Sequence, residues 1–276
     1  MIGTLLVLAA PGDGGAAAVV RGLTARGGYG GVLAVTPAEL ARSRWSHRLN
    51  GRGEPSTRIT LPTGQVLDDG TVGAVLHRLP GLPFAAGAEK GPQAKNAVYT
   101  HSERQALVAS WLLSLVPRVI GPISAYGTVF GPVSPTTALV HAERCGLPVA
   151  RRGGATRSGL VGRPAPGERH VPRLAWPGGP GSAVPVDVVP EAGDHDSLLV
   201  AGDRVIGLSA GDYAERCHRL ATALGTRHVE IRLTRRATGT VVTDVNLCPR
   251  LDDPRHVEAT ASLMVAVAEQ STRRPE

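Results

Sequence analysis

The stretch Val241-Val242-Thr243-Asp244-Val245-Asn246-Leu247-Cys248-Pro249 decides how the fold of this chain is interpreted. Its β-branched residues favour a strand, and Pro249 marks the strand's end. Side chains alternate between the two faces of a strand, so Asp244 and Asn246 are expected on the same face. Carboxylate and amide oxygens are ligands that suit Mg²⁺. The stretch predicts either a strand end that holds a metal ion or an ordinary hairpin strand with its polar side chains in water.

A second strand is expected just before this one. The alternating segment His228-Val229-Glu230-Ile231-Arg232-Leu233 predicts it, and Ala237-Thr238-Gly239-Thr240 predicts the hairpin turn. Antiparallel pairing of the two strands would bring Glu230 beside Asp244 and Asn246.

Composition restricts the class of protein. The chain has 276 residues, of which 42% are hydrophobic and 19% charged, and no apolar run is long enough to cross a membrane. Three widely spaced cysteines fit neither a disulfide framework nor a zinc site, so we expect a cytoplasmic protein without a membrane partner. Its net charge is +7, but the arginines are scattered and aromatic residues make up only 3%, so no nucleic-acid partner is expected.

The first 36 residues predict a strand, a Gly-rich turn, a helix and a second strand. Gly12-x-Gly14-x-x-Ala17 formally matches the dinucleotide-binding fingerprint. The acidic residue that would hold a ribose is replaced by Thr36-Pro37. A tight turn in a Rossmann-like lobe is therefore favoured, and a dinucleotide-dependent enzyme remains an alternative.

Further elements are predicted from hydrophobic periodicity and from turn and capping residues. The segment at 151–183 is rich in Gly, Arg and Pro and predicts a loop. The predicted elements are a hairpin at Thr57–Leu67, a helix that opens with the capping box Thr100-His101-Ser102-Glu103, a helix at Ser134–Cys145, strands at Val184–Val189 and Ser197–Val200, and helices at Asp212–Leu224 and Pro254–Glu269.

Three stretches carry a resemblance to a known family. Ala74–Arg78 is followed by a long helix, Val119-Ile120-Gly121-Pro122 leads into a helix that ends at Gly146-Leu147-Pro148-Val149, and the two C-terminal strands carry Glu230-x-Arg232 and Asp244-Val245-Asn246. This order resembles the ATP-grasp superfamily, and especially its carboxylate-amine-ligase branch of bacterial peptide maturases. The resemblance covers roughly the last 200 residues.

The resemblance implies an α/β fold with two parts. We expect a Rossmann-like pre-ATP-grasp lobe at residues 1–147 and a shortened ATP-grasp-like domain at residues 148–276, with the loop at 151–183 inside it. In this family ATP and Mg²⁺ serve to activate a substrate carboxylate as an acyl phosphate, which an amine then attacks. The implied partner is a small carboxylate or a peptide.

The family pattern also implies roles for individual residues of this chain. Glu230, Asp244 and Asn246 would be the Mg²⁺ ligands. Arg232 and Arg250 would contact phosphate or an acidic substrate during catalysis. The cofactor-binding positions would be Asp194, in the turn Gly193-Asp194-His195-Asp196, and Arg152, in an arginine-rich segment where the family has lysine.

The chain departs from the family at the nucleotide clamp. Lys90 and Lys95 are its only lysines, and both precede the lobe that normally supplies two lysines to ATP. Asp196 stands where a phosphate-facing arginine is expected, and a carboxylate aimed at a triphosphate would repel it. Two interpretations therefore stay open: an active ligase, or a degenerate ATP-grasp protein that serves as a binding or accessory subunit for a peptide or for a partner ligase.

Overall fold

The computed structural model describes residues 2–79, 81–83, 92–124, 133–150, 153–155, 168–172, 186–190, 195–236 and 239–273. Its N-terminal part is built on a parallel sheet with the strand order β2–β1–β6–β7. A crossover helix, α1, joins the first two strands, and the order of elements is that of the predicted Rossmann-like lobe. The elements are β1 (Thr4–Ala9), α1 (Gly14–Arg26), β2 (Val32–Val35), β6 (Val72–Arg78) and β7 (Val119–Ile120).

Helix α2 (Pro37–Arg42) and strand β3 (Arg44–Leu49) were not predicted. A capping box starts this helix, because Thr36 and Glu39 bond reciprocally to each other's backbone N–H groups, and Pro37 stands at the first helical turn. Strand β3 pairs with β4 (Pro55–Thr60), and β4 pairs with β5 (Val66–Asp68), which confirms the predicted hairpin.

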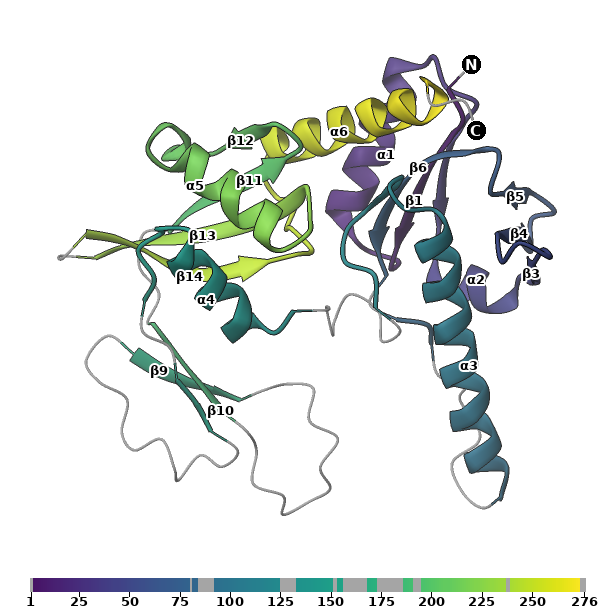
Figure 1. Cartoon of the computed structure of the whole chain (residues 1–276), viewed down its shortest axis with the longest axis horizontal. Coiled ribbons are helices and arrows are strands. Elements are labelled where there is room, and N and C mark those ends of the chain that lie inside the picture. The colour runs from purple at the N-terminus through teal and green to yellow at the C-terminus, as the bar shows by residue number, and fades with distance from the viewer. Residues whose placement is uncertain are drawn as a thin grey trace.

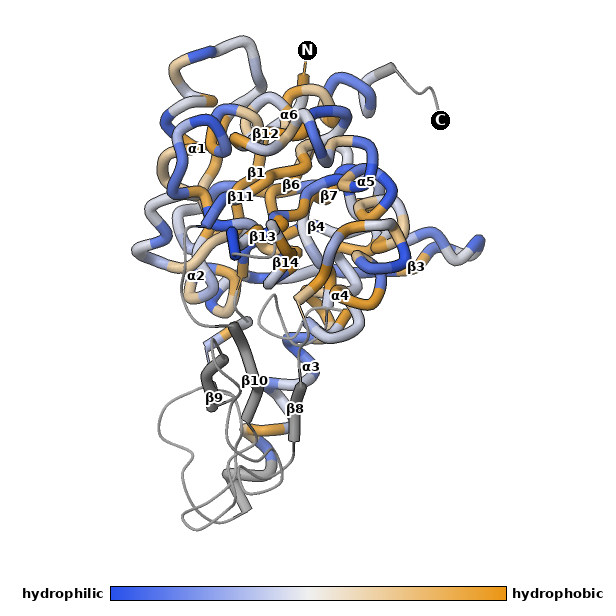
Figure 2. The backbone as a smooth tube through the Cα atoms, turned by 90° about the vertical axis from the view of Figure 1, so that its left-hand side faces the viewer, coloured by the Kyte–Doolittle hydropathy of each residue, from blue (hydrophilic) through white to orange (hydrophobic). Residues whose placement is uncertain are grey.

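Both faces of the parallel sheet are covered by helices. One face packs against α1 and the C-terminal helix α6 (Pro254–Arg273) through Leu5, Val7 and Leu76. The other face packs against α3 (Pro92–Ser114), and Leu8 lies in this cluster. In Figure 1 the long helix α3 runs away from the sheet, and in Figure 2 the apolar colour concentrates in β1 and β6 at the centre.

Helix α3 begins earlier than the sequence indicated. Its first residue is Pro92, so the predicted capping box at Thr100 lies inside the helix. Proline suits the first turn because its missing N–H is one that the helix leaves unbonded anyway, and an interior threonine has no capping role. The helix therefore begins eight residues before its predicted start at Thr100.

The C-terminal part is an antiparallel sheet with the order β12–β11–β13–β14. Its strands are β11 (His195–Ala201), β12 (Arg204–Ile206), β13 (His228–Arg236) and β14 (Gly239–Asn246). Helices α4 (Pro135–Arg144) and α5 (Ala210–Ala223) cover one face of it. The strands, and the helices at 210–223 and 254–273, lie close to their predicted ranges.

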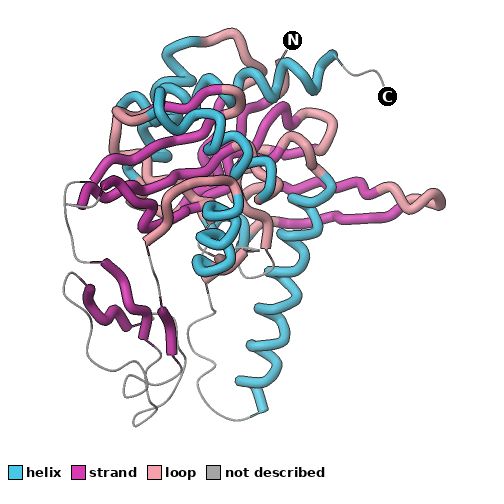
Figure 3. The backbone as a smooth tube through the Cα atoms, turned by 60° about the vertical axis from the view of Figure 1, so that its left-hand side comes forward, coloured by secondary structure: helices cyan, strands magenta, loops and turns pink. Residues whose placement is uncertain are grey.

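The segment 151–183 carries strands that the sequence did not indicate. Strands β8 (Gly153–Ala155) and β9 (Glu168–Pro172) lie within it, and with β10 (Val186–Pro190) they form a small antiparallel sheet in the order β8–β10–β9. The three strands lie apart from the main body in Figures 1 and 3. Gly and Pro have low strand propensity, so pairing with β10 rather than local preference forms these strands.

The domain boundary predicted at residue 147 stays a prediction. Elements from either side of this residue pack against elements from the other side. Helix α4, which precedes that residue, packs on β14, and α6 packs on α1 and β6 of the N-terminal sheet. Within the described residues, no helix is both long enough and apolar enough to cross a membrane.

Candidate functional site

The register between β13 and β14 gathers four polar side chains on one face of the C-terminal sheet. Glu230 lies opposite Asn246, and Arg232 lies opposite Asp244. Residues directly opposite in an antiparallel pair share a face, and so do residues two apart in one strand. All four side chains are therefore on the same side. The sequence-based expectation that Glu230 lies beside Asn246 and close to Asp244 agrees with this arrangement, while the roles of these residues stay predictions.

The opposite face of the same sheet explains why this register is fixed. Val229, Ile231 and Val245 point to that face and are buried against α4 and α5. A shift of one residue would expose this apolar set and bury the polar one, so the core determines the register. The pairing between β13 and β14 shifts register between Arg232 and Leu233. Thr243 is therefore an extra residue of β14 without an opposite residue in β13.

Glu230 is the most buried polar residue of the site, with 3% of its surface exposed. Its Oε1 accepts from Ser197 Oγ at 2.8 Å and from Arg250 Nη2 at 3.3 Å. Its Oε2 accepts from the Arg250 backbone N–H at 2.9 Å and from Asn246 Nδ2 at 3.4 Å. Burial by itself raises the pKa of Glu230, but these hydrogen bonds and the Arg250 charge outweigh it and hold the pKa below its ordinary value. Glu230 is therefore a carboxylate with four donors.

Asp244 and Asn246 are only partly buried. The backbone N–H of Val245 donates to Asp244 Oδ1 at 3.0 Å, and the backbone N–H of Cys248 donates to Asn246 Oδ1 at 2.9 Å. The carboxylate and the amide oxygen are hard donors of the type that Mg²⁺ binds, so these two residues fit such an ion.

Glu230 fits a metal ion poorly. Both of its oxygens already accept two hydrogen bonds, and a carboxylate oxygen has about two lone-pair positions. Within the described residues, no cluster of three or more His, Cys, Asp or Glu side chains could hold a metal. A metal at this face would therefore depend on Asp244 and the amide Asn246.

The two predicted catalytic arginines differ in environment. Arg250 has 49% of its side chain exposed while it pairs with Glu230. Arg232 is partly buried and lies opposite Asp244 in the ladder. Both arginines therefore lie at the face that carries the oxygen ligands, where a guanidinium can contact an anionic group. The predicted cofactor-binding positions Arg152 and Asp194 lie outside the described residues.

Asp196 does not present its carboxylate to this face. It alternates with Ser197 along β11, so it points to the side that α5 covers, and it accepts from the backbone N–H of Ser209 at 2.7 Å and of Leu208 at 3.3 Å. The expected repulsion of a triphosphate by Asp196 is therefore not supported. Its carboxylate holds the turn before α5.

Three residues of this face were missed by the sequence analysis. Ser197 bonds Glu230, and His195 Nδ1 lies 2.9 Å from the Thr234 hydroxyl. The alternation His195-x-Ser197 in β11 was a usable signal, since it places both side chains on one face. It could not show that this face is the one that carries Glu230, because that depends on the pairing of β11 with β13.

The Gly-rich turn of the N-terminal lobe is occupied by protein contacts. Asp13 caps α1 by accepting from the Ala16 N–H at 2.9 Å, and its other oxygen accepts from Arg78 Nε at 2.8 Å. A Cβ at Gly15 would lie 2.5 Å from the Leu251 side chain, so this glycine serves close packing. An anion at the helix start would meet the Asp13 carboxylate, which disfavours dinucleotide binding here.

Arg78 also connects the two parts of the molecule. From the end of β6 its Nη1 donates to the Pro249 carbonyl at 2.5 Å, just after β14. Arg78, Asp13 and Arg250 line a cavity of about 560 Å³ between α1 and the start of α6. The sequence singled out Arg78 only as a strand end, since a contact between residues 171 positions apart has no local signature.

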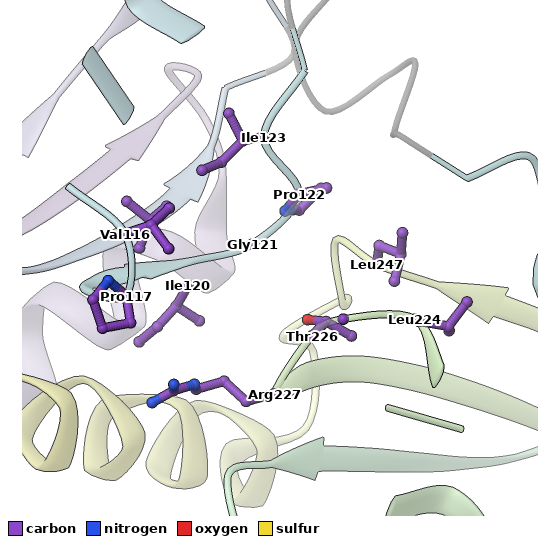
Figure 4. Close-up of a pocket in the computed structure, with 12 residues that line it drawn as sticks. Val116, Pro117, Ile120, Gly121, Pro122, Ile123, Leu224, Thr226, Arg227 and Leu247 are labelled. Carbon is purple, nitrogen blue, oxygen red and sulfur yellow. The ribbon is translucent and has the colours of Figure 1, made fainter. Parts of the chain in front are cut away.

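A second hollow, of about 270 Å³, lies between β7 and the turn that leads from α5 to β13 (Figure 4). Apolar residues from both parts face each other across it, including Ile120, Pro122 and Leu247. Arg227 is the charged side chain among its lining residues. It therefore lacks the oxygen ligands and the acid–base groups that the Glu230 face provides.

The chain was compared with known proteins. No family model matches the sequence, and no curated protein matches it. Among solved structures, the macrocyclase MdnC from Microcystis aeruginosa MRC, bound with precursor peptide MdnA, aligns with a TM-score of 0.70 and 13% identity over 95% of this chain and 99% of that one.

Two solved ATP-grasp ligases have the same fold as this chain. The ATP-grasp ligase PsnB, complexed with minimal precursor, Mg and ADP, aligns with a TM-score of 0.64 and 17% identity over 96% of this chain and 98% of that one. A RiPP-associated ATP-grasp ligase from Chryseobacterium gregarium, with ADP and a leader and core peptide, aligns with a TM-score of 0.63 and 10% identity over 96% of this chain and 97% of that one. The α/β fold class is confirmed: the chain shares the fold of these solved ATP-grasp ligases.

Proposed function

We propose that this protein is an ATP- and Mg²⁺-dependent ligase that joins a carboxylate of a peptide to an amine. The observation that carries the proposal is the single polar face on which Glu230, Arg232, Asp244 and Asn246 come together. The fold supports it, because solved proteins of the same fold are described as a macrocyclase bound with a precursor peptide and as ATP-grasp ligases bound with a precursor or with a leader and core peptide. A cytoplasmic location stays a prediction.

Asp244 and Asn246 would hold Mg²⁺ in this proposal. The ion would supply charge neutralisation for phosphate oxygens when it is bound. Arg232 and Arg250 would bind anionic oxygen atoms, since a guanidinium can donate two parallel hydrogen bonds to a carboxylate or a phosphate. Arg152 and Asp194 are proposed as nucleotide contacts on the family pattern alone.

The proposed reaction has two steps. A substrate carboxylate oxygen attacks the γ-phosphorus of ATP, so one P–O bond forms, the bond to ADP breaks, and ADP leaves. An amine nitrogen then attacks the acyl carbon, inorganic phosphate departs with the electron pair of the C–O bond, and the nitrogen loses a proton. Arg232 and Arg250 would stabilise the negative charge that builds up on oxygen in both steps.

A peptide is the proposed substrate class. The solved structures of MdnC, PsnB and the Chryseobacterium gregarium protein are complexes with precursor, leader or core peptides. The half-exposed Arg250 beside the polar face offers a contact for a carboxylate side chain of the substrate.

One feature favours a second candidate function. No lysine follows Lys95, so arginine is the only permanently charged basic side chain left for a nucleotide clamp in residues 148–276. Arginine is bulkier than lysine and forks, so it does not replace lysine freely at a tight phosphate site. The second candidate is therefore an accessory subunit that keeps the fold, binds a peptide or a partner ligase, and does not turn over ATP.

A thermal-shift titration with MgATP separates the two candidates. Ligand at about 100 times its Kd stabilises a protein by about 2.7 kcal/mol, which raises Tm by roughly 5–10 °C for a chain of this size. The ligase predicts such a rise, its loss in Asp244→Ala, and its retention in Asp203→Ala, which removes a carboxylate from the turn after β11. No rise in the wild-type protein at millimolar MgATP would refute the ligase and favour the accessory subunit.

A further inference from the structure

We propose that Glu230 is a positioning residue that does not bind the metal ion, and that it fixes Asn246 and the turn at Pro249–Arg250 beside the ligand Asp244. This inference rests on the proposed function, because it assigns roles within the same site. It differs from the role that the family pattern implied for Glu230.

The Glu230 carboxylate is already fully engaged by hydrogen-bond donors. It is almost completely buried and receives four hydrogen bonds, two on each oxygen. One donor is the backbone N–H of Arg250, which cannot rotate away as a side chain can. Binding an ion through Glu230 would replace several of these bonds, and a buried N–H left without an acceptor costs about 1–3 kcal/mol.

The Glu230 carboxylate holds the turn after β14 in place. Arg250 follows β14 by four residues and is bound to Glu230 through both its backbone and its side chain. The preceding carbonyl, that of Pro249, accepts from Arg78, which is itself paired with Asp13. The turn after β14 is therefore fixed from β13 on one side and from the N-terminal lobe on the other.

Asn246 is oriented by the same carboxylate. Its Nδ2 donates to Glu230 and its Oδ1 accepts from the Cys248 N–H, so the two ends of the amide have different partners. This pattern sets which end of the amide is the oxygen, the only atom of the group that can bind Mg²⁺. Glu230 thus acts on the metal through the orientation of Asn246, in the way that partners behind a metal ligand usually do.

The test uses the full-length protein with Mn²⁺ and ADP as the probe. Electron paramagnetic resonance of free Mn²⁺ gives the affinity, and line broadening in H₂¹⁷O counts the water molecules bound to the ion. We expect Glu230→Ala to weaken binding about 10-fold with no additional bound water. Asp244→Ala, which removes a ligand, is expected to add one bound water. Glu230→Gln, which keeps an oxygen that can accept from the Arg250 N–H, is expected to recover part of the affinity.

Two results would overturn the role of Glu230 while leaving the ligase proposal intact. One additional bound water in Glu230→Ala would show that Glu230 is a ligand, and an unchanged affinity would show that it positions nothing. If Glu230→Ala does not fold, Arg250→Ala decides. Weaker Mn²⁺ affinity supports positioning, equal affinity means that the turn at Arg250 positions no ligand, and tighter affinity means that Arg250 competes with the ion for Glu230. A wild-type protein that binds no Mn²⁺·ADP would refute the proposed function and this inference together.

Discussion

The substitution Arg78→Met tests whether the two parts of the molecule depend on one partly buried arginine. Arg78 has 10% of its side chain exposed, and its partner Asp13 has 18%. Methionine keeps much of the length of the side chain but removes the charge and every donor. The change therefore leaves the Asp13 carboxylate without its ion pair and the Pro249 carbonyl without the Arg78 donor.

The size of the effect follows from these contacts. Removing one partner of a buried ion pair costs about 3–5 kcal/mol, because the other charge stays buried without compensation. Asp13 keeps the Ala16 N–H and some contact with water, which places the expected loss near the lower limit, at about 3 kcal/mol. For a chain of this size the loss corresponds to a fall in Tm of roughly 6–12 °C.

Urea unfolding followed by circular dichroism measures this loss, with Arg58→Met as the control for removing an exposed arginine. Asp13→Asn keeps a good capping side chain. In the Arg78→Met background it should therefore cost less than it does in the wild-type protein, since no charge is left to pair. A loss below about 1 kcal/mol for Arg78→Met, or additive costs in the double variant, would refute the reasoning.

Three further predictions concern single residues and are checked by simple measurements. A Cβ added at Gly14 would meet no atom within 4 Å, so Gly14→Ala should raise the free energy of unfolding by up to about 1 kcal/mol. A Cβ at Gly15 would clash with Leu251, so Gly15→Ala should lower the free energy of unfolding. Equal effects of the two substitutions in urea unfolding would contradict this packing. Burial raises the pKa of the Cys217 thiol to about 12, so Ellman's reagent at pH 8 should label it only after denaturation, and labelling of three thiols in the native protein would argue against its burial. Burial lowers the pKa of His77 from 6.5 to about 4, so the unfolded state takes up the proton first and stability falls as the pH drops from 6.5 to 4. Unfolding at pH 7 and pH 5 should show a smaller fall for His77→Leu, and an equal fall would mean that His77 is protonated in the folded state.

Much of the architecture followed from local patterns. The two C-terminal strands could be placed because β-branched residues alternate with polar ones in both of them. The start of α3 was wrong because a capping pattern at Thr100 is equally compatible with a helix interior. The strands β8 and β9 were missed because non-local pairing, which leaves little trace in composition, forms them.

The candidate site was predictable only in part, and Asp196 shows the limit. Its position in the sequence suggested a charge aimed at a phosphate, but strand alternation turns it toward α5 and the backbone of Ser209. Which face of β11 is which depends on its pairing with β13, and therefore on contacts more than 30 residues apart, such as the 33 positions that separate Ser197 from Glu230.

The sequence by itself determined that Asp244 and Asn246 share a face, because the alternation of side chains is a property of any strand. Only the tertiary structure decided what surrounds them: the burial of Glu230, the four donors on its carboxylate, and the contact of Arg78 with Pro249. The physical reason is that a backbone period is local, whereas hydrogen-bond partners and burial depend on residues that only the folded chain brings together.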